Sequence, residues 1–324
     1  MEEKIKITML GNTNAGKTCY MLGMYATMSP GVRGFTLTTE DMDVDLDLRE
    51  VWDQLVDTQD EKRWPEPTVA TKPYIFEFCY GLKEILSFEW IDYRGGTLTT
   101  RSTDPLQDTK ELEAFLKAST CIFLCVSGQH LANSIKGNEA GVSRSTGADR
   151  MIGFLRKLRK ELPAQAEKPA IVIIITKRDL VSRQKEEIIS DIKTLFSPFF
   201  AASSGWFTMI CPVTLGRELG KDLHGGAIIP ENIHLPVTFS IYYALKNRAK
   251  NIRNHQQAAS DWLDEKRGFW ANLLGASERR EKHTAVVRYS TEIESLDRDM
   301  NLLMKELMEN VTAYYEGREV ELDI

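Results

Sequence analysis

The sequence has few cysteines and no long hydrophobic run, and both absences exclude classes of protein. Its five cysteines are an odd number without CxxC spacing, so we expect buried thiols in a reducing compartment rather than disulfides or a zinc site. The longest apolar runs, around residues 121–126 and 171–175, are much too short to cross a bilayer. The first residues, Met1-Glu-Glu-Lys, lack the basic-then-apolar order of a secretion signal. These features predict a soluble, cytoplasmic protein without membrane insertion.

The chain also lacks an excess of basic residues. In 324 residues, Lys and Arg number 41 against 47 Asp and Glu, a net charge of −6, which argues against nucleic acid as a partner. Most of the excess lies in residues 251–324, which hold ten basic and fifteen acidic residues. No serine stands in a G-x-S-x-G context, so a nucleophilic serine hydrolase is not indicated.

Short β-branched runs alternate with amphipathic stretches along residues 1–250. This alternation predicts an α/β fold with a sheet of about six mostly parallel strands and helices on both faces. The expected strands are residues 5–10, 74–80, 85–92, 121–127, 170–176 and 206–211. Residues 74–92 would form the antiparallel exception, because the turn Gly81-Leu82-Lys83 is too short for a parallel crossover.

Two regions interrupt the alternation. Residues 29–71 are long and polar, with an acidic helix predicted at residues 40–56. After residue 251 no strand is expected, and residues 252–315 are predicted to form two antiparallel helices with a heptad seam. The seam comprises Val286, Tyr289, Ile293, Leu296, Met300, Leu303, Leu307 and Tyr314. We therefore predict a domain over residues 1–250 with an enlarged insertion at 29–71, and a helical hairpin or coiled-coil extension over 251–324.

A phosphate-binding motif follows the first expected strand. Gly11-Asn12-Thr13-Asn14-Ala15-Gly16-Lys17-Thr18 matches G-x-x-x-x-G-K-[ST] and leads directly into a helix. Glycines there permit a tight turn and bring backbone N–H groups to phosphate oxygens, and the helix N-terminus adds partial positive charge. Lys17 would reach the phosphates, and the Thr18 hydroxyl would bind Mg²⁺.

Two further motifs follow at strand ends. Asp92-Tyr-Arg-Gly95 is a D-x-x-G motif, whose carboxylate can hold Mg²⁺ and whose Gly95 N–H can sense a γ-phosphate. Thr176-Lys177-Arg-Asp179 ends the fifth expected strand. The Asp179 carboxylate can accept the two N–H groups of a guanine edge, and adenine offers no such pair.

In order and context these motifs resemble the Ras-like (TRAFAC-class) P-loop GTPases over about residues 4–250. The resemblance implies a GTPase that binds GTP or GDP and Mg²⁺ and is slow without an activator. It also implies a switch threonine, either Thr68 or Thr71, and a backbone N–H on the base from Val213 or Thr214. Residues 92–96 and 232–239 are further similar to the bacterial double-GTPase group. The implied nucleotide contacts are Asn12, Thr13, Asn14, Ala15, Gly16, Lys17, Thr18, Cys19, Thr176, Lys177, Asp179, Val213 and Thr214.

For catalysis the resemblance implies Lys17, Asn14, Thr68 and Gly95, with Thr18, Thr68 and Asp92 at the metal. The sequence departs from the Ras-like pattern at Gly96, where the family has a water-orienting Gln. Asn14 instead resembles the asparagine that coordinates K⁺ in tRNA-modifying and iron-transport GTPases, so K⁺ is a further candidate cofactor. Arg94 is a second, weaker candidate, as an internal arginine finger that would supply positive charge at the phosphates.

Three functions remain open at this point. The first is a molecular switch that hydrolyses GTP and acts on an effector or activating protein through its switch regions and helical tail. The second is a GTP-binding scaffold with little or no hydrolysis, in keeping with Gly96. The third is a mechanochemical GTPase that self-assembles through the tail, for example as a homodimer.

Overall fold

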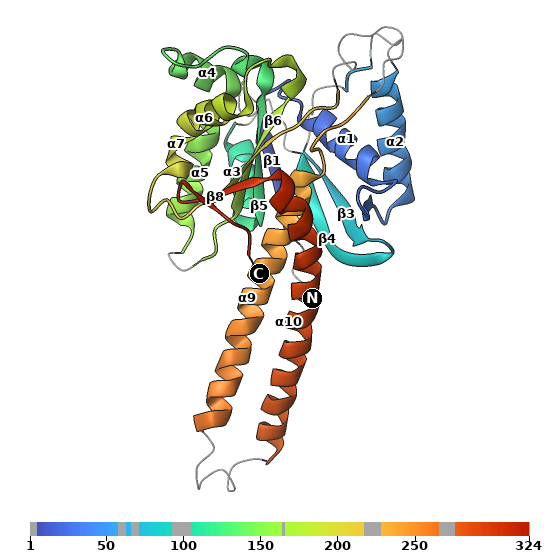
Figure 1. The fold of residues 1–324 in the computed structure, drawn as a ribbon, viewed down its shortest axis with the longest axis vertical. Coiled ribbons are helices and arrows are strands. Elements are labelled where there is room, and N and C mark those ends of the chain that lie inside the picture. The colour runs from blue at the N-terminus through green and yellow to red at the C-terminus, as the bar shows by residue number, and fades with distance from the viewer. Residues whose placement is uncertain are drawn as a thin grey trace. The chain divides into compact units, whose positions relative to one another are not determined.

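The computed structural model describes residues 5–57, 63–65, 71–92, 105–163, 166–216, 228–265 and 276–323 (Figure 1). The chain divides into two compact units. Unit 1 comprises residues 1–240 and 310–321, and unit 2 comprises residues 241–309 and 322–324. The chain leaves unit 1 after residue 240 and returns to it at residue 310.

Unit 1 is built on a sheet that has nine strands in the described part of the chain, in the order β2-β3-β4-β1-β5-β6-β7-β8-β9. The five central strands, from β4 to β7, pair in parallel, whereas β2-β3-β4 and β7-β8-β9 pair antiparallel. The strands are β1 (Ile5–Gly11), β2 (Phe35–Thr38), β3 (Lys72–Tyr80), β4 (Lys83–Asp92), β5 (Cys121–Ser127), β6 (Ala170–Thr176), β7 (Phe207–Pro212), β8 (Thr312–Tyr315) and β9 (Arg318–Val320).

The α/β class and the six expected strands are present, but two predictions about the sheet were wrong. The sheet is larger than six strands and is not mostly parallel, because antiparallel strands extend both of its edges. Residues 312–315, expected to continue a helix, form β8 instead, and residues 318–320 of the expected helical extension form β9. Tyr314 therefore belongs to a strand and not to a heptad seam.

The central strands form because their residues are β-branched or apolar and are covered on both faces. Every residue of β5 and β6 is buried. Ile122, Leu124 and Val126 of β5 belong to one core cluster with α3, α5 and α6, while Phe123 packs edge-on against Tyr20 of α1. Because successive strand side chains point to opposite faces, a continuous apolar run is what a doubly covered strand requires.

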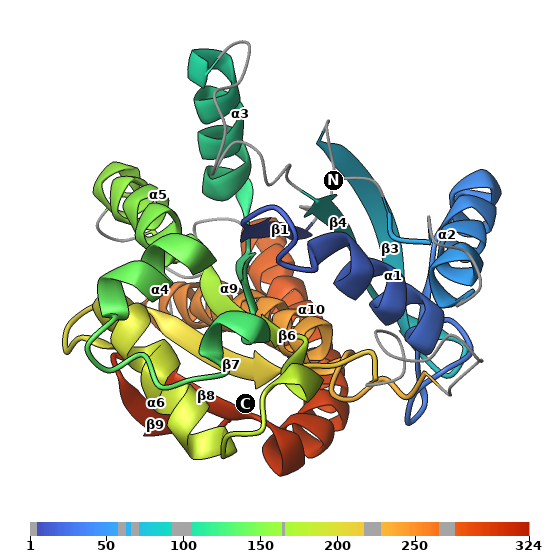
Figure 2. The same cartoon turned by 90° about the horizontal axis from the view of Figure 1, so that it is seen from above.

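Helices cover both faces of this sheet. Figure 2 shows α5 and α6 on one side and α1 and α2 on the other. The helical segments of unit 1 are α1 (Lys17–Met28), α2 (Met42–Val56), α3 (Pro105–Ala118), η2 (Gly128–Leu131), α4 (Glu139–Thr146), α5 (Ala148–Glu161), η3 (Arg178–Leu180), α6 (Lys185–Leu195), α7 (Ser197–Phe200) and the first six residues of α9 (Leu235–Glu265).

The inserted helix α2 is fixed to α1 by a polar cluster. The buried Tyr25 hydroxyl donates to the Asp45 carboxylate, and Arg49 donates to the same carboxylate at 2.9 Å. A second Arg49 nitrogen donates to the Ser29 hydroxyl at 2.7 Å. The helix begins at a favourable cap, because the Asp41 carboxylate accepts the Asp43 N–H at 2.9 Å. The predicted acidic helix at 40–56 is thus confirmed at Met42–Val56.

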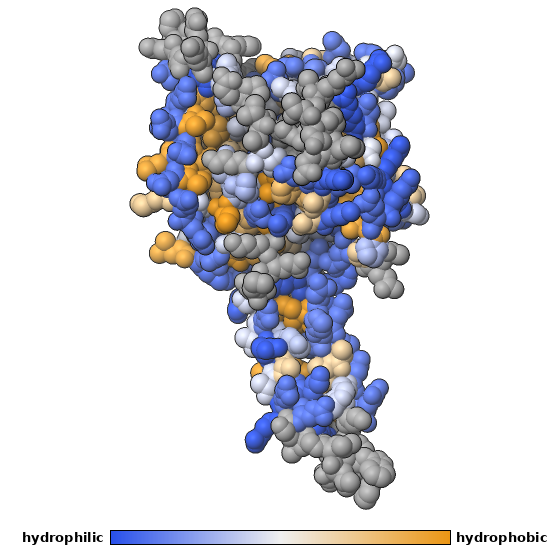
Figure 3. All heavy atoms as spheres, turned by 180° about the vertical axis from the view of Figure 1, so that it is seen from behind, coloured by the Kyte–Doolittle hydropathy of each residue, from blue (hydrophilic) through white to orange (hydrophobic). Residues whose placement is uncertain are grey.

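Unit 2 consists of two antiparallel helices, α9 beyond residue 240 and most of α10 (Ala276–Asn310). They run side by side in Figure 1 and are joined by Arg248–Glu292 at 2.7 Å and Arg253–Asp297 at 2.6 Å. The predicted seam is buried at Leu296, Met300, Leu303 and Leu307. The outer surface of the hairpin is mostly hydrophilic in Figure 3. Among the described residues, no helix combines the length and apolar character that crossing a membrane requires.

Candidate nucleotide site

The phosphate-loop motif forms the connection between β1 and α1, as its sequence predicts. Gly16 precedes the helix with a φ of 89°, a left-handed conformation that glycine adopts without steric cost. At Gly11 a Cβ would lie 2.8 Å from the carbonyl oxygen of Cys125, so any side chain there would force the loop away from β5. Asn14 also has a positive φ of 64° and is exposed at the tip of the loop.

Lys17 is buried under this loop, with only 6% of its surface exposed. Its ammonium group donates to the carbonyls of Gly11 at 3.0 Å and Asn12 at 3.3 Å. Burial lowers the pKa of Lys17, and the negative charge of nearby Asp92 opposes that shift. The amine therefore lies in a poorly hydrated position where an anionic ligand would stabilise its charged form.

Thr18 and Asp92 meet beside the carboxyl ends of β1 and β4, although 74 residues separate them. The Thr18 hydroxyl donates to the Asp92 carboxylate at 3.1 Å, and Asp92 is 97% buried at the end of β4. β4 is parallel to β1, so its carboxyl end lies beside the start of the phosphate loop. A hydroxyl beside a buried carboxylate is an oxygen-ligand pair of the kind that Mg²⁺ prefers.

The residues after β6 approach the same loop from the other side. Thr176 donates its hydroxyl hydrogen to the Ala15 carbonyl at 2.6 Å, and Lys177 donates to the Asn14 carbonyl at 3.0 Å. Lys177 has a φ of 52°, and the chain then turns into η3, which contains Asp179. These two hydrogen bonds join the T-K-x-D motif to the phosphate loop.

Asp179 is oriented by Thr214, which follows β7. The Thr214 hydroxyl donates to one Asp179 carboxylate oxygen at 2.7 Å and accepts the Gly216 N–H at 2.9 Å. The contact of a Val213 or Thr214 N–H with the base stays a prediction, and in this structure both N–H groups donate to backbone carbonyls. The Val213 N–H already donates to Ile175 at 2.8 Å, and the Thr214 N–H donates to Glu231 at 3.3 Å.

Three remaining loop residues differ in exposure. Thr13 is exposed at the loop tip. The Asn12 side chain donates to the Ser145 carbonyl at 2.9 Å, so it braces the loop against the end of α4. Burial raises the pKa of the Cys19 thiol to about 11, which keeps it protonated at neutral pH. The five cysteines are free thiols. Cys121, Cys125 and Cys211 are buried, whereas Cys19 and Cys79 are only partly buried.

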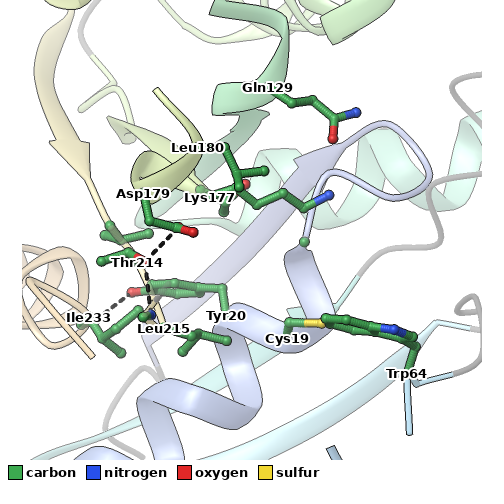
Figure 4. Close-up of a pocket in the computed structure, with 14 residues that line it drawn as sticks. Cys19, Tyr20, Trp64, Gln129, Lys177, Asp179, Leu180, Thr214, Leu215 and Ile233 are labelled. Atoms are coloured by element: carbon green, nitrogen blue, oxygen red, sulfur yellow. Dashed lines mark hydrogen bonds between the residues drawn. The ribbon is translucent and has the colours of Figure 1, made fainter. Parts of the chain in front are cut away.

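A cavity of about 300 Å³ lies between these elements. Figure 4 shows Asp179 and Thr214 at one end, Cys19 and Trp64 at the other, and Lys177 between them. The lining residues are Gly16, Cys19, Tyr20, Trp64, Gln129, Thr176, Lys177, Asp179, Leu180, Val213, Thr214, Leu215, Gly216 and Ile233. Seven lining residues were not predicted from the sequence, because none of them is a defining position of a recognisable motif: Tyr20, Trp64, Gln129, Leu180, Leu215, Gly216 and Ile233.

Several predicted residues fall outside the described part of the chain: Thr68, Arg94, Gly95 and Gly96. Thr71 is described, and its hydroxyl oxygen is buried without a hydrogen-bond partner among the described residues. Thr71 directly precedes Lys72, whose backbone pairs with Asp92 in register. Thr71, the second candidate for the switch threonine, therefore directly precedes the residue of β3 that pairs with Asp92, and Asp92 in turn accepts the Thr18 hydroxyl.

Among the described residues there is no cluster of three or more His, Cys, Asp or Glu side chains that could hold a metal ion by itself. A cation at Thr18 and Asp92 would therefore need ligands from a bound molecule or water. This is how Mg²⁺ is commonly held in nucleotide sites, where phosphate oxygens and waters complete its coordination.

Solved structures include several that resemble this chain, and one of them is a GTPase-like domain. The GTPase-like domain of Ski7 from S. cerevisiae, solved bound to GTP, is similar to this chain with a TM-score of 0.42 and 14% sequence identity. The match covers 74% of this chain and 50% of that one, so this chain spans about half the length of the Ski7 domain. No protein-family model and no curated protein matches the chain.

Proposed function

We propose that the protein binds GTP with Mg²⁺ and hydrolyses it as a molecular switch that acts on a protein partner. One observation carries this proposal: the ends of β1, β4, β6 and β7 place a phosphate loop, a Thr18–Asp92 pair and Asp179 around the same region of the sheet edge. Ligands of open α/β sheets bind at the carboxyl ends of the strands.

Each end of the site fits one part of the nucleotide. The loop N–H groups, the N-terminus of α1 and buried Lys17 would bind the phosphates, with the Lys17 amine moving from the Gly11 and Asn12 carbonyls to phosphate oxygens. Thr18 and Asp92 would hold Mg²⁺, which neutralises charge on the phosphates. Asp179, oriented by Thr214, would accept the two N–H groups of guanine.

Base selectivity is the first test. Titration with GTP, GDP and ATP should show binding of both guanine nucleotides and weak competition by ATP, because Asp179 would face adenine with no N–H pair to accept. Lys17→Ala should abolish binding of GTP. Leu82→Ala, at an exposed turn outside the cavity, is the matched control. Equal affinity for ATP and GTP would contradict the guanine assignment.

Turnover is a separate question, because Gly96 has no side chain to orient water. Asn14 is exposed at the loop tip and would act with K⁺ at the phosphates. Phosphate release should then be faster in KCl than in NaCl at equal ionic strength, and Asn14→Ala should remove the difference. Equal rates in both salts would refute the K⁺ proposal and leave GTP binding intact.

The alternative of a scaffold with little hydrolysis rests on the same Gly96. If phosphate release stays negligible in K⁺ and in the presence of a captured partner, while GTP binds, the scaffold is the correct function.

The switch threonine can be assigned by comparing Thr68→Ala with Thr71→Ala: loss of Mg²⁺-dependent GTP affinity in only one of them identifies it. Nucleotide-dependent oligomers in sizing experiments would favour the mechanochemical alternative.

A further inference from the structure

Trp64 is an aromatic wall of the cavity that no motif predicts. It belongs to the inserted region between α1 and β3, far in sequence from the other lining residues. In Figure 4 its indole lies alongside Cys19, at the end of the cavity away from Asp179. The guanidinium of Arg63 lies over the same ring, 4.8 Å from its centre.

The exposure of this indole is unusual for its position. Half of the Trp64 surface is exposed although the side chain lines a cavity, whereas Trp90 and Trp206 are almost fully buried in the core. Exposed indole surface is unfavourable in water, and a flat ligand in the cavity would cover it. Because Asp179 would take the guanine edge at the other end, the sugar side of the nucleoside is the part that reaches Trp64, and its apolar face can cover the indole.

We propose that Trp64 packs against the nucleoside half of the bound nucleotide and thereby makes the inserted region sensitive to whether the site is occupied. The inference rests on the proposed function, since it takes the cavity ligand to be a guanine nucleotide. It assigns affinity to Trp64 and base selectivity to Asp179. The two roles are separable, because the residues lie at opposite ends of the cavity.

Substitution of Trp64 tests the affinity. Trp64→Ala should weaken GDP binding about tenfold, because the apolar indole surface that the nucleoside covers is lost. Trp64→Phe, which keeps an aromatic ring, should restore affinity to within about threefold of the wild type. In both variants GTP should still be preferred over ATP to the same degree. Trp52→Phe changes an indole of α2 that does not line the cavity, and it should leave GDP affinity unchanged.

Intrinsic fluorescence supplies a second readout. Because nucleotide would cover the Trp64 indole, GDP should change the emission of the wild type and of Trp52→Phe, and the change should be lost in Trp64→Phe. Wild-type GDP affinity in Trp64→Ala, or an undiminished emission change in Trp64→Phe, would overturn the inference and leave the proposed function standing. Failure of the wild type to bind any guanine nucleotide would overturn both.

Discussion

Replacing Asp179 with Asn is the sharpest test of how the site recognises its base. The carboxylate would accept N1–H and N2–H of guanine, and an amide presents an N–H₂ donor in place of one acceptor oxygen. Hydrogen bonds to a charged group contribute about 1.5–3 kcal/mol each. Asp179→Asn loses one of these bonds, leaves the other with a neutral acceptor and sets an amide N–H against a guanine N–H. Together these changes should cost about 3 kcal/mol, so the affinity for GTP should fall by about a hundredfold.

The contact between Asp179 and Thr214 adds a second, smaller step. Thr214→Val keeps the shape of the side chain but removes the hydroxyl that donates to Asp179 at 2.7 Å. Losing that one hydrogen bond should weaken GTP binding about tenfold. In the double variant Asp179→Asn/Thr214→Val the two effects should not add, because Thr214 acts on the ligand through Asp179.

Competition against a fluorescent GDP measures all of these affinities in one format. Xanthosine triphosphate is the informative competitor, since xanthine carries a carbonyl where guanine has its N2 amine. The Asn amide of Asp179→Asn can donate to that carbonyl, so this variant should bind xanthosine triphosphate better than GTP. Unchanged GTP affinity in Asp179→Asn would refute the assignment of Asp179 to the base, and full additivity in the double variant would refute the role of Thr214.

Two further predictions concern helix α2 and the turns between antiparallel strands. Arg49 holds the pKa of Asp45 below its ordinary value of 3.8. The contribution of Asp45 to stability is therefore present above pH 3.8 and is lost as the pH falls below it. The difference in Tm between the wild type and Asp45→Asn should be clear at pH 6 and shrink in acid. Gly81 and Gly317 both have positive φ, but their surroundings differ. A Cβ at Gly317 would lie only 1.8 Å from a backbone oxygen, whereas a Cβ at Gly81 would have no atom within 4 Å. Denaturant unfolding should therefore show a loss of unfolding free energy of about 1 kcal/mol for Gly81→Ala and a clearly larger loss for Gly317→Ala. Equal costs would contradict the described β8–β9 turn.

The central part of the fold could be predicted from the sequence because its signals are local. A buried strand such as Ala170–Thr176 needs a continuous apolar run, and the sequence shows it. Helix α1 begins where the phosphate-loop motif predicts a helix, directly after Gly16. The closeness of Thr18 and Asp92 also follows from local signals, because both lie at the carboxyl ends of parallel neighbouring strands.

The remaining features depend on contacts that no local pattern shows. β8 contains Tyr314, whose spacing continues the apolar seam of α10, so the helical period extended past the true end of the helix at Asn310. A turn signal was present, since Gly317 follows Glu316 and both have positive φ. Trp64 lines the cavity only through tertiary structure, and a lone tryptophan in a polar stretch carries no such information.

The additions to the sheet are placed where they leave the site intact. A sheet can grow only at its edges, and the chain uses both: β2 pairs with β3 on one side, and β8 and β9 extend β7 on the other, all antiparallel. The parallel order β4-β1-β5-β6-β7 is unbroken, so the strand ends that carry Lys17, Asp92 and Asp179 keep their spacing. β7 nevertheless receives β8 directly after α10 and carries Thr214 just past its own end. Any change that weakens the β7–β8 pairing should therefore affect the position of Thr214 before that of the phosphate loop, which follows β1 and is separated from β7 by β5 and β6.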